Sequence, residues 1–211
     1  MKYLSIFLLF SLFFLSSTCN QKTEIDNITD APEVVPADEQ YANVYQPLDG
    51  TWKGVFKIFE DQDRKQANAV DLKNIGLVNI KKPSLKMVNS IQVEQTYKSE
   101  SPYFQKVWIT DTYEEDGTEK TVKSEGVNKV QDGKMWCVVR KPNETVIHEG
   151  STEGEHTIIW QSSIQKPQKI EYFYETVEAD TYEIIGYGYY EGDDISLSPK
   201  LWFYGRYERQ K

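Results

Sequence analysis

The chain has 211 residues, of which 27% are charged and 39% hydrophobic, a balance typical of a soluble globular domain with room for a sizeable core. Its formal net charge is −9 and no basic patch offsets it, which argues against nucleic acid as a partner because an acidic surface repels phosphate backbones. Aromatic residues make up 13% of the chain, and such flat side chains favour β-strands.

The first residues have the pattern of a secretory signal peptide. An almost wholly apolar run covers 4–15, which is the length of a signal h-region and short for a membrane-spanning helix. Small polar residues at 16–18 lead to Cys19. This arrangement resembles the lipobox of bacterial lipoproteins, in which signal peptidase II cuts before a cysteine whose thiol is acylated. The resemblance implies removal of 1–18 and a lipid on Cys19; ordinary secretion with an incidental cysteine is the alternative.

A lipidated Cys19 would place the protein in the cell envelope, as an outer-membrane lipoprotein held to the bilayer by its acyl chains. Residues 19–46 are polar and acidic, contain Pro32 and Pro36, and have few large apolar side chains. This composition is typical of a flexible, disordered tether, because it offers too little apolar surface to form a core. We therefore predict a signal peptide over 1–18, a lipidated tether over 19–46 and one folded domain over 47–211.

From Trp52 onward, apolar and polar residues alternate with a period of two, which is the pattern of half-buried strands. Alternating or short apolar segments follow one another at 52–59, 75–80, 87–97, 103–113, 135–140, 146–148, 157–160, 170–177, 182–190 and 201–209. Asp116-Gly117 and Asp132-Gly133 are hairpin turn signals. Nine or ten strands joined by hairpin-length links predict an all-β fold, a single antiparallel up-and-down β-barrel of about 8–10 strands, because an open sheet of that size would leave exposed edges.

Gly50-Thr51-Trp52 stands at the start of the first strand, and Arg206 lies in the last. The Gly-x-Trp resembles the opening signature of lipocalin-like (calycin-type) β-barrels. In that family the Trp packs across the closed end of the barrel, and a basic residue of the last strand lies over its indole ring. The resemblance implies that Trp52 and Arg206 form this structural pair, held by cation–π attraction of about 0.5–2 kcal/mol. It also implies that any ligand enters at the opposite end.

Metal and catalytic motifs are not evident in the chain. His148 and His156 would face each other in a symmetric hairpin centred near Thr152, as a metal or haem-edge site or a pH switch; the alternative is two unrelated surface histidines. No third ligand is indicated by spacing, so we predict no metal and no cofactor. Cys137 has no activating base beside it in the sequence, which favours a buried structural thiol.

The candidate ligand-binding residues are large side chains expected near the barrel interior: Trp108, His156, Trp160, Tyr172, Tyr174, Tyr187 and Tyr189. Inward rings would either fill a small barrel or line an apolar pocket with hydroxyl groups. Gly186 and Gly188 mark a bend or a close approach within their strand. No residue is predicted to be catalytic, and the oligomeric state is not indicated.

Three functions are compatible with this pattern. The first, which we place ahead of the others, is a lipid-anchored envelope protein whose barrel binds a small apolar or amphiphilic ligand without changing it. The second is a filled barrel that presents outward Tyr and acidic residues to a protein or glycan. The third is a barrel isomerase, lyase or hydrolase that uses His156 or an inward carboxylate, for which Asp111, Glu125 and Glu171 are candidates. The state of the barrel interior, hollow or filled, and the polar groups that face it separate these possibilities.

Overall fold

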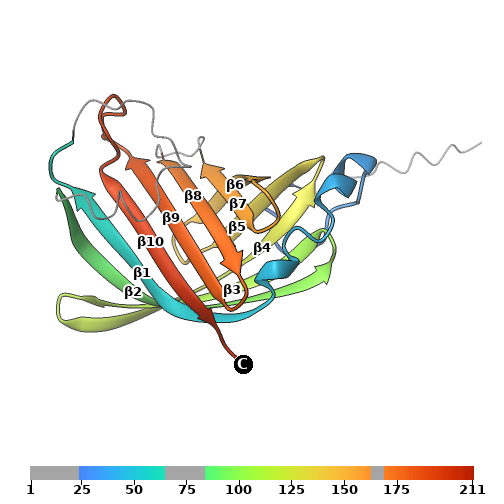
Figure 1. Ribbon diagram of the computed structural model, residues 1–211, viewed down its shortest axis with the longest axis horizontal. Coiled ribbons are helices and arrows are strands. Elements are labelled where there is room, and N and C mark those ends of the chain that lie inside the picture. Colours follow the sequence, from blue (N-terminus) through green and yellow to red (C-terminus); the bar gives the residue numbers. More distant parts are fainter. Residues whose placement is uncertain (1–23, 65–83, 163–168) are drawn as a thin grey trace, which may run out of the picture.

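The computed structural model describes residues 24–64, 84–162 and 169–211, and ten strands in these ranges close into an antiparallel up-and-down β-barrel (Figure 1). The strands are β1 (Gly50–Asp61), β2 (Leu85–Ser101), β3 (Phe104–Glu115), β4 (Thr118–Gln131), β5 (Lys134–Arg140), β6 (Thr145–Thr152), β7 (Thr157–Ser162), β8 (Lys169–Glu178), β9 (Thr181–Tyr190) and β10 (Leu201–Arg209). Each strand pairs with its neighbours in sequence, and β10 pairs with β1 to close the barrel. The predicted fold class is confirmed.

The two predicted hairpin turns form as their sequences require. Asp116 and Gly117 join β3 to β4, and Asp132 and Gly133 join β4 to β5. All four residues have positive φ, between 52° and 73°, which is the backbone of a two-residue loop that follows the twist of its strands. These turns fix the registers of the two ladders, so the inward and outward faces of β3, β4 and β5 follow from them.

Two mid-strand glycines lie directly against aromatic rings of neighbouring strands. A Cβ at Gly186 would stand 2.7 Å from the Phe173 ring, and one at Gly150 would stand 2.4 Å from the Trp160 ring. Any larger residue at either position would displace the ring, so the glycines allow these rings to lie flat against neighbouring strands. The predicted close approach at Gly186 is therefore confirmed.

The segment before β1 differs from the predicted tether. Residues 24–48 pack against the barrel and include two short 3-10 helices, η1 (Pro36–Tyr41) and η2 (Gln46–Leu48). Figure 1 shows this segment, in blue, beside β3 and β4 before it leads into β1. The Ile28 side chain is 8% exposed and packs on the outward face of β3, β4 and β5. Residues 24–48 therefore belong to the folded domain, and the predicted boundary at residue 47 is too late.

Hydrogen bonds fix this segment in place. The Lys129 ammonium group is buried beneath it and donates to the carbonyl oxygens of Glu24 and Asn27, at 3.2 and 2.9 Å. Burial lowers the pKa of Lys129, and the charge of Asp26 acts against that shift. The buried Asp38 carboxylate accepts a hydrogen bond from the Gly133 amide at 2.6 Å. Such contacts are made by single, widely spaced residues, and for this reason they leave no periodic pattern in the sequence.

Some predictions fall outside the described residues. Cys19 and the predicted signal peptide precede residue 24, and the strand predicted at 75–80 lies in the gap between 64 and 84. No helix in the described part of the chain is long and apolar enough to cross a membrane.

Candidate functional site

The end of the barrel where β1 begins is sealed by Trp52, whose side chain is fully buried. Its indole nitrogen donates a hydrogen bond to the Leu48 carbonyl at 2.7 Å, and its ring packs edge-on against Tyr182 at 5.6 Å. The guanidinium of Arg209 lies 4.1 Å from the ring centroid and donates to the backbone carbonyls of Asp49 and Pro47. Trp52 therefore closes this end of the barrel. Arg209, which lies over its ring, also holds the backbone at Pro47 and Asp49, just before β1.

The prediction that Arg206 covers Trp52 is wrong. The Arg206 side chain is 56% exposed and pairs with Glu183 at 2.9 Å on the outer surface. Side chains alternate along β10, and Arg206 stands between Gly205 and Tyr207, which both face inward. Arg209 has the inward phase and is the direct partner of Trp52 in the β1–β10 ladder.

Above this packed floor, the lumen contains a cavity of about 350 Å³. This volume lies near the lower end of the range for small-molecule sites, roughly 300–1,000 Å³. The wall is formed mainly by apolar side chains that alternate inward along their strands, among them Phe56, Ile58, Ile91, Ile109, Phe173 and Phe203. The barrel is therefore hollow in its upper part and solid at its floor.

A carboxylate cluster lies on the cavity wall near the end where β8 begins. Glu171 Oε2 is 3.2 Å from His148 Nε2, and Tyr190 donates its hydroxyl proton to Glu171 Oε1 at 2.6 Å. The Lys169 ammonium group is 3.6 Å from the same carboxylate. Burial pushes the pKa of Glu171 upward, but the hydrogen bonds from His148 and Tyr190 and the charge of Lys169 together hold that pKa below its usual value. Glu171 is thus an ionised, fully partnered group.

A second carboxylate, Glu175, lies deeper in the same strand. Its Oε2 atom accepts hydrogen bonds from the Tyr182 hydroxyl at 2.7 Å and the Trp160 indole nitrogen at 3.0 Å. Burial raises the pKa of Glu175 to about 7, although both hydrogen bonds favour the ionised form. Nothing in the described part of the chain bonds to its Oε1 atom. Glu175 is therefore a half-partnered acid that titrates near neutral pH.

An unpaired amide completes the floor of the cavity. Gln95, which is 4% exposed, accepts a hydrogen bond at Oε1 from the Tyr97 hydroxyl at 2.9 Å. Its Nε2 atom is buried and has no hydrogen-bond partner within the described ranges. Buried polar groups in folded proteins are almost always paired, so an unpaired donor in a residue that lines a cavity calls for a reason.

Cys137 and the histidines do not form a metal or nucleophile site. Burial and the charge of Glu175 raise the pKa of the Cys137 thiol, which keeps it protonated and unreactive. The β6–β7 ladder pairs Thr152 with Ile158, so the hairpin is not centred near Thr152 as predicted. His148 faces the lumen and His156 is exposed in the connecting loop, so the predicted facing pair is wrong. The described residues contain no group of three His, Cys, Asp or Glu side chains that could hold a metal ion.

Two of the predicted ligand-binding residues, Trp160 and His156, line cavities, and each lines a different one. Trp160 is on the wall of the lumen, with its indole bonded to Glu175. His156 lines a separate cavity of about 370 Å³ at the closed end, between the Gln40–Leu48 part of the N-terminal segment and the β6–β7 loop. Glu175 borders both cavities.

The other five predicted residues lie on the outer face of the barrel. Trp108 is 44% exposed; the rings of Tyr172 and Tyr187 contact each other at a tilt, with centroids 5.0 Å apart; and Tyr189 donates to the Leu197 carbonyl. Tyr174 has the same phase as Tyr172 and is absent from the described lining of the lumen. In β8 the inward phase belongs to Glu171, Phe173 and Glu175, because the Phe173 ring occupies the space that Gly186 leaves in β9. Of the candidate carboxylates, Asp111 and Glu171 face the lumen and Glu125 is exposed.

Sequence patterns did not single out Gln95, Phe173 or Glu175 as site residues. The one available signal lay in the neighbouring strand, where Gly186 and Gly188 pair with Phe173 and Glu171. Glycines opposite two positions of a strand leave room for inward side chains there, and this would have set the inward phase of β8.

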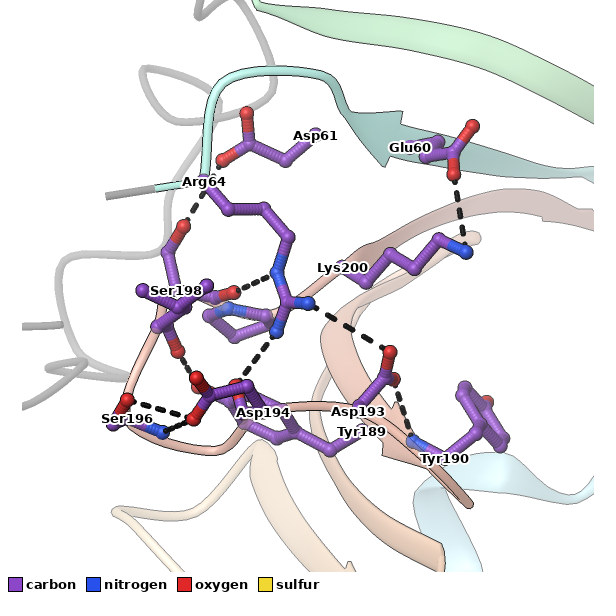
Figure 2. Close-up of polar contacts among 12 residues, drawn as sticks. Glu60, Asp61, Arg64, Tyr189, Tyr190, Asp193, Asp194, Ser196, Ser198 and Lys200 are labelled. Carbon is purple, nitrogen blue, oxygen red and sulfur yellow. Dashed lines mark hydrogen bonds and ion pairs between the residues drawn. The ribbon is translucent and has the colours of Figure 1, made fainter. Parts of the chain in front are cut away.

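The rim of the barrel at the end opposite Trp52 is held by a polar network, which Figure 2 shows. Arg64, just beyond β1, donates to the carbonyl oxygens of Ser198 and Asp194 in the β9–β10 loop, both at 2.8 Å. Its guanidinium also lies 3.8 Å from the Asp193 carboxylate, and Ser198 donates to Asp61 at 3.2 Å. The β9–β10 loop is thereby fastened to the end of β1.

Comparisons with known proteins find no matching family model and no matching curated protein. Among solved structures, the chain is similar to an S-type phycobiliprotein lyase, CPES, from Guillardia theta, with a TM-score of 0.49 and 6% identity over 85% of this chain and 99% of that one. It is also similar to EF1p2_mFAP2b bound to DFHBI, with a TM-score of 0.37 and 10% identity over 81% of this chain and 99% of that one. A redesigned β-barrel, mFAP0, bound to DFHBI, has a TM-score of 0.35 and 12% identity over 78% of this chain and 100% of its own. At these identities and TM-scores, the likenesses indicate neither a ligand nor an activity for this chain.

Proposed function

We propose that this protein binds a small apolar or amphiphilic molecule inside its barrel while an acyl group on Cys19 anchors it to the cell envelope. The observation that carries the binding function is the hollow lumen, a cavity of about 350 Å³ with an apolar wall and a few convergent polar groups. The alternative function, presentation of outward residues to a protein or glycan, assumes a barrel filled by side chains, and the cavity does not favour it.

Binding can be tested by native mass spectrometry of protein purified from its own host. We expect a retained small molecule, and we expect Ile109→Trp to lose it because Ile109 lines the cavity and a larger ring there would occupy the lumen. The matched control is Thr110→Trp, which changes the neighbouring residue with the opposite phase of β3. Wild-type protein that carries no ligand and binds none from a host lipid extract would contradict the proposal, as would equal retention by both variants.

Anchoring rests on Cys19. We expect cells fed an alkyne-labelled fatty acid to transfer the label to the wild-type protein and not to Cys19→Ala, because the acyl chains would be attached to that thiol and to the amino group it exposes. Cys137→Ala is the control, since its thiol is buried within the barrel and should not affect labelling. Label that persists in Cys19→Ala, or wild-type protein that is never labelled, would contradict the anchor.

A barrel enzyme is a second candidate, and one observation favours it. Glu175 lies in the cavity with a free carboxylate oxygen and a pKa of about 7, which suits a general base near neutral pH. Such an enzyme would be an isomerase, lyase or hydrolase. An enzyme would release a chemically altered molecule. A carrier would release its ligand unchanged, with the same mass that native mass spectrometry detects in the complex.

A further inference from the structure

We infer that the ligand carries a neutral hydroxyl group and binds with this head group at the floor of the lumen, between Gln95 and Glu175. The inference rests on the proposed ligand-binding function and adds the chemistry and the orientation of the bound molecule.

The first observation is the unpaired amide of Gln95. Its Oε1 atom is used by the Tyr97 hydroxyl, while its Nε2 atom is buried without a partner in the described part of the structure. Gln95 is one of the residues that line the cavity. An apolar ligand would leave this donor unpaired, and leaving it so is unfavourable in a site without water. A ligand atom that accepts a hydrogen bond would satisfy it.

The second observation is the free oxygen of Glu175. Tyr182 and Trp160 both donate to Oε2, so Oε1 is left to accept a further hydrogen bond. Gln95 and Glu175 belong to one cluster, because Tyr97 bonds to Gln95 while its ring packs edge-on against Tyr182, which bonds to Glu175; the Tyr97 and Tyr182 ring centroids are 6.3 Å apart. Burial and, after it, the charge of Glu175 raise the pKa of Tyr97. The floor therefore presents one unused donor and one unused acceptor.

A hydroxyl group fits this pair because it both accepts and donates a hydrogen bond. A carboxylate head group fits poorly, since it cannot donate and would bring a second negative charge beside Glu175 in a desolvated site. The remaining charges of the lumen also favour a neutral molecule. Two acids, Asp111 and Glu171, are balanced there by two bases, Lys141 and Lys169, so the wall has no excess of cations to hold an anion.

The apolar part of the ligand would then extend from the floor toward the rim. Phe56, Ile91, Ile109, Phe173 and Phe203 supply the surrounding surface. Burial of this chain would provide most of the affinity, and the two hydrogen bonds at the floor would select the head group.

Three probes with the same kind of chain test the head group: 1-decanol, its isomer 1-methoxynonane, and decanoate. Binding is measured by isothermal titration at pH 8, where Glu175 is ionised. We expect 1-decanol to bind roughly five- to tenfold more tightly than the ether, which accepts from Gln95 but cannot donate to Glu175. Decanoate should bind more weakly than both. Because these comparisons use the wild-type protein, they hold even if a variant fails to fold.

Variants of one strand locate the effect. We expect Gln95→Leu to weaken 1-decanol binding roughly five- to tenfold, because the amide donor is lost, and to bring its affinity close to that of the ether. Gln92→Leu is the matched control, because Gln92 is exposed on the opposite face of β2, and it should bind all three probes as the wild type does.

Equal binding of 1-decanol by wild type and Gln95→Leu, or preference for decanoate, would overturn the inference and leave the proposed binding function intact. If none of the three probes binds the wild type, the inference also fails. The proposed function fails separately, when native mass spectrometry finds no retained molecule and a lipid extract supplies none.

Discussion

Replacing Trp52 with alanine is expected to lower the free energy of unfolding by about 3–5 kcal/mol, as is typical for the loss of a buried large aromatic side chain. The ring is fully buried, contacts Tyr182, and lies beneath the Arg209 guanidinium. Its removal would leave a void at the closed end, unpair the Leu48 carbonyl, and leave the Arg209 guanidinium without the ring on which it stacks. Urea denaturation followed by circular dichroism measures the loss.

Trp108→Ala is the control for this substitution. Trp108 also lies in a strand but is 44% exposed on the outer face, so its removal should cost less than about 1 kcal/mol. A loss below 1 kcal/mol for Trp52→Ala, or a similar loss for both variants, would show that Trp52 does not seal the barrel as its contacts indicate.

Glu175→Gln is expected to stabilise the protein at pH 8 by up to roughly 3 kcal/mol. The carboxyl has a pKa of about 7 in the folded state and about 4.3 in an unfolded chain, so the folded state binds the extra proton between these pH values. The contribution of Glu175 to the free energy of unfolding is therefore fully present below about pH 4.3 and is lost as the pH rises through 7. Glutamine keeps an oxygen that can accept from Tyr182 and Trp160, without the charge.

Denaturation midpoints measured from pH 4.5 to pH 8 should show this as a flattened pH profile for Glu175→Gln relative to the wild type. Glu178→Gln is the matched control, because Glu178 is exposed at the end of the same strand and its substitution should leave the wild-type slope unchanged. If Glu175→Gln retains the wild-type fall in stability between pH 5 and pH 8, another group is responsible for it.

The period-two pattern predicted the barrel because a closed meander is the arrangement that leaves no strand edge open. The two Asp-Gly turns determined the registers of the β3–β4 and β4–β5 ladders locally. The pattern could not assign inward and outward faces where both faces are apolar. In β8 both phases carry large side chains, Tyr172 and Tyr174 against Phe173, so only the glycines of β9 distinguish them. Most of the predicted ligand residues were for this reason placed on the wrong side of the wall.

Other features depend on contacts between segments that are far apart in the sequence. Arg209 rather than Arg206 covers Trp52, because the β1–β10 register places it there, and that register is set by closure of the whole barrel. The segment over 24–48 is held by Lys129 and by a few apolar anchors such as Ile28, whose effect depends on a barrel surface that already exists. A composition that reads as a tether can thus be ordered by the domain it precedes.

The attachment of this segment bears on how far the domain can stand from a membrane. Because the backbone at Glu24 is held against Lys129, only the stretch from Cys19 to Glu24 would connect the proposed acyl group on Cys19 to the folded domain. A fully extended chain of that length reaches roughly 18 Å, less than the thickness of the hydrocarbon core of a bilayer. Lys129 lies at the end of the barrel that Trp52 closes, so an acylated Cys19 would hold this closed end near the lipid surface, and the rim formed by the β9–β10 loop would lie on the side away from it.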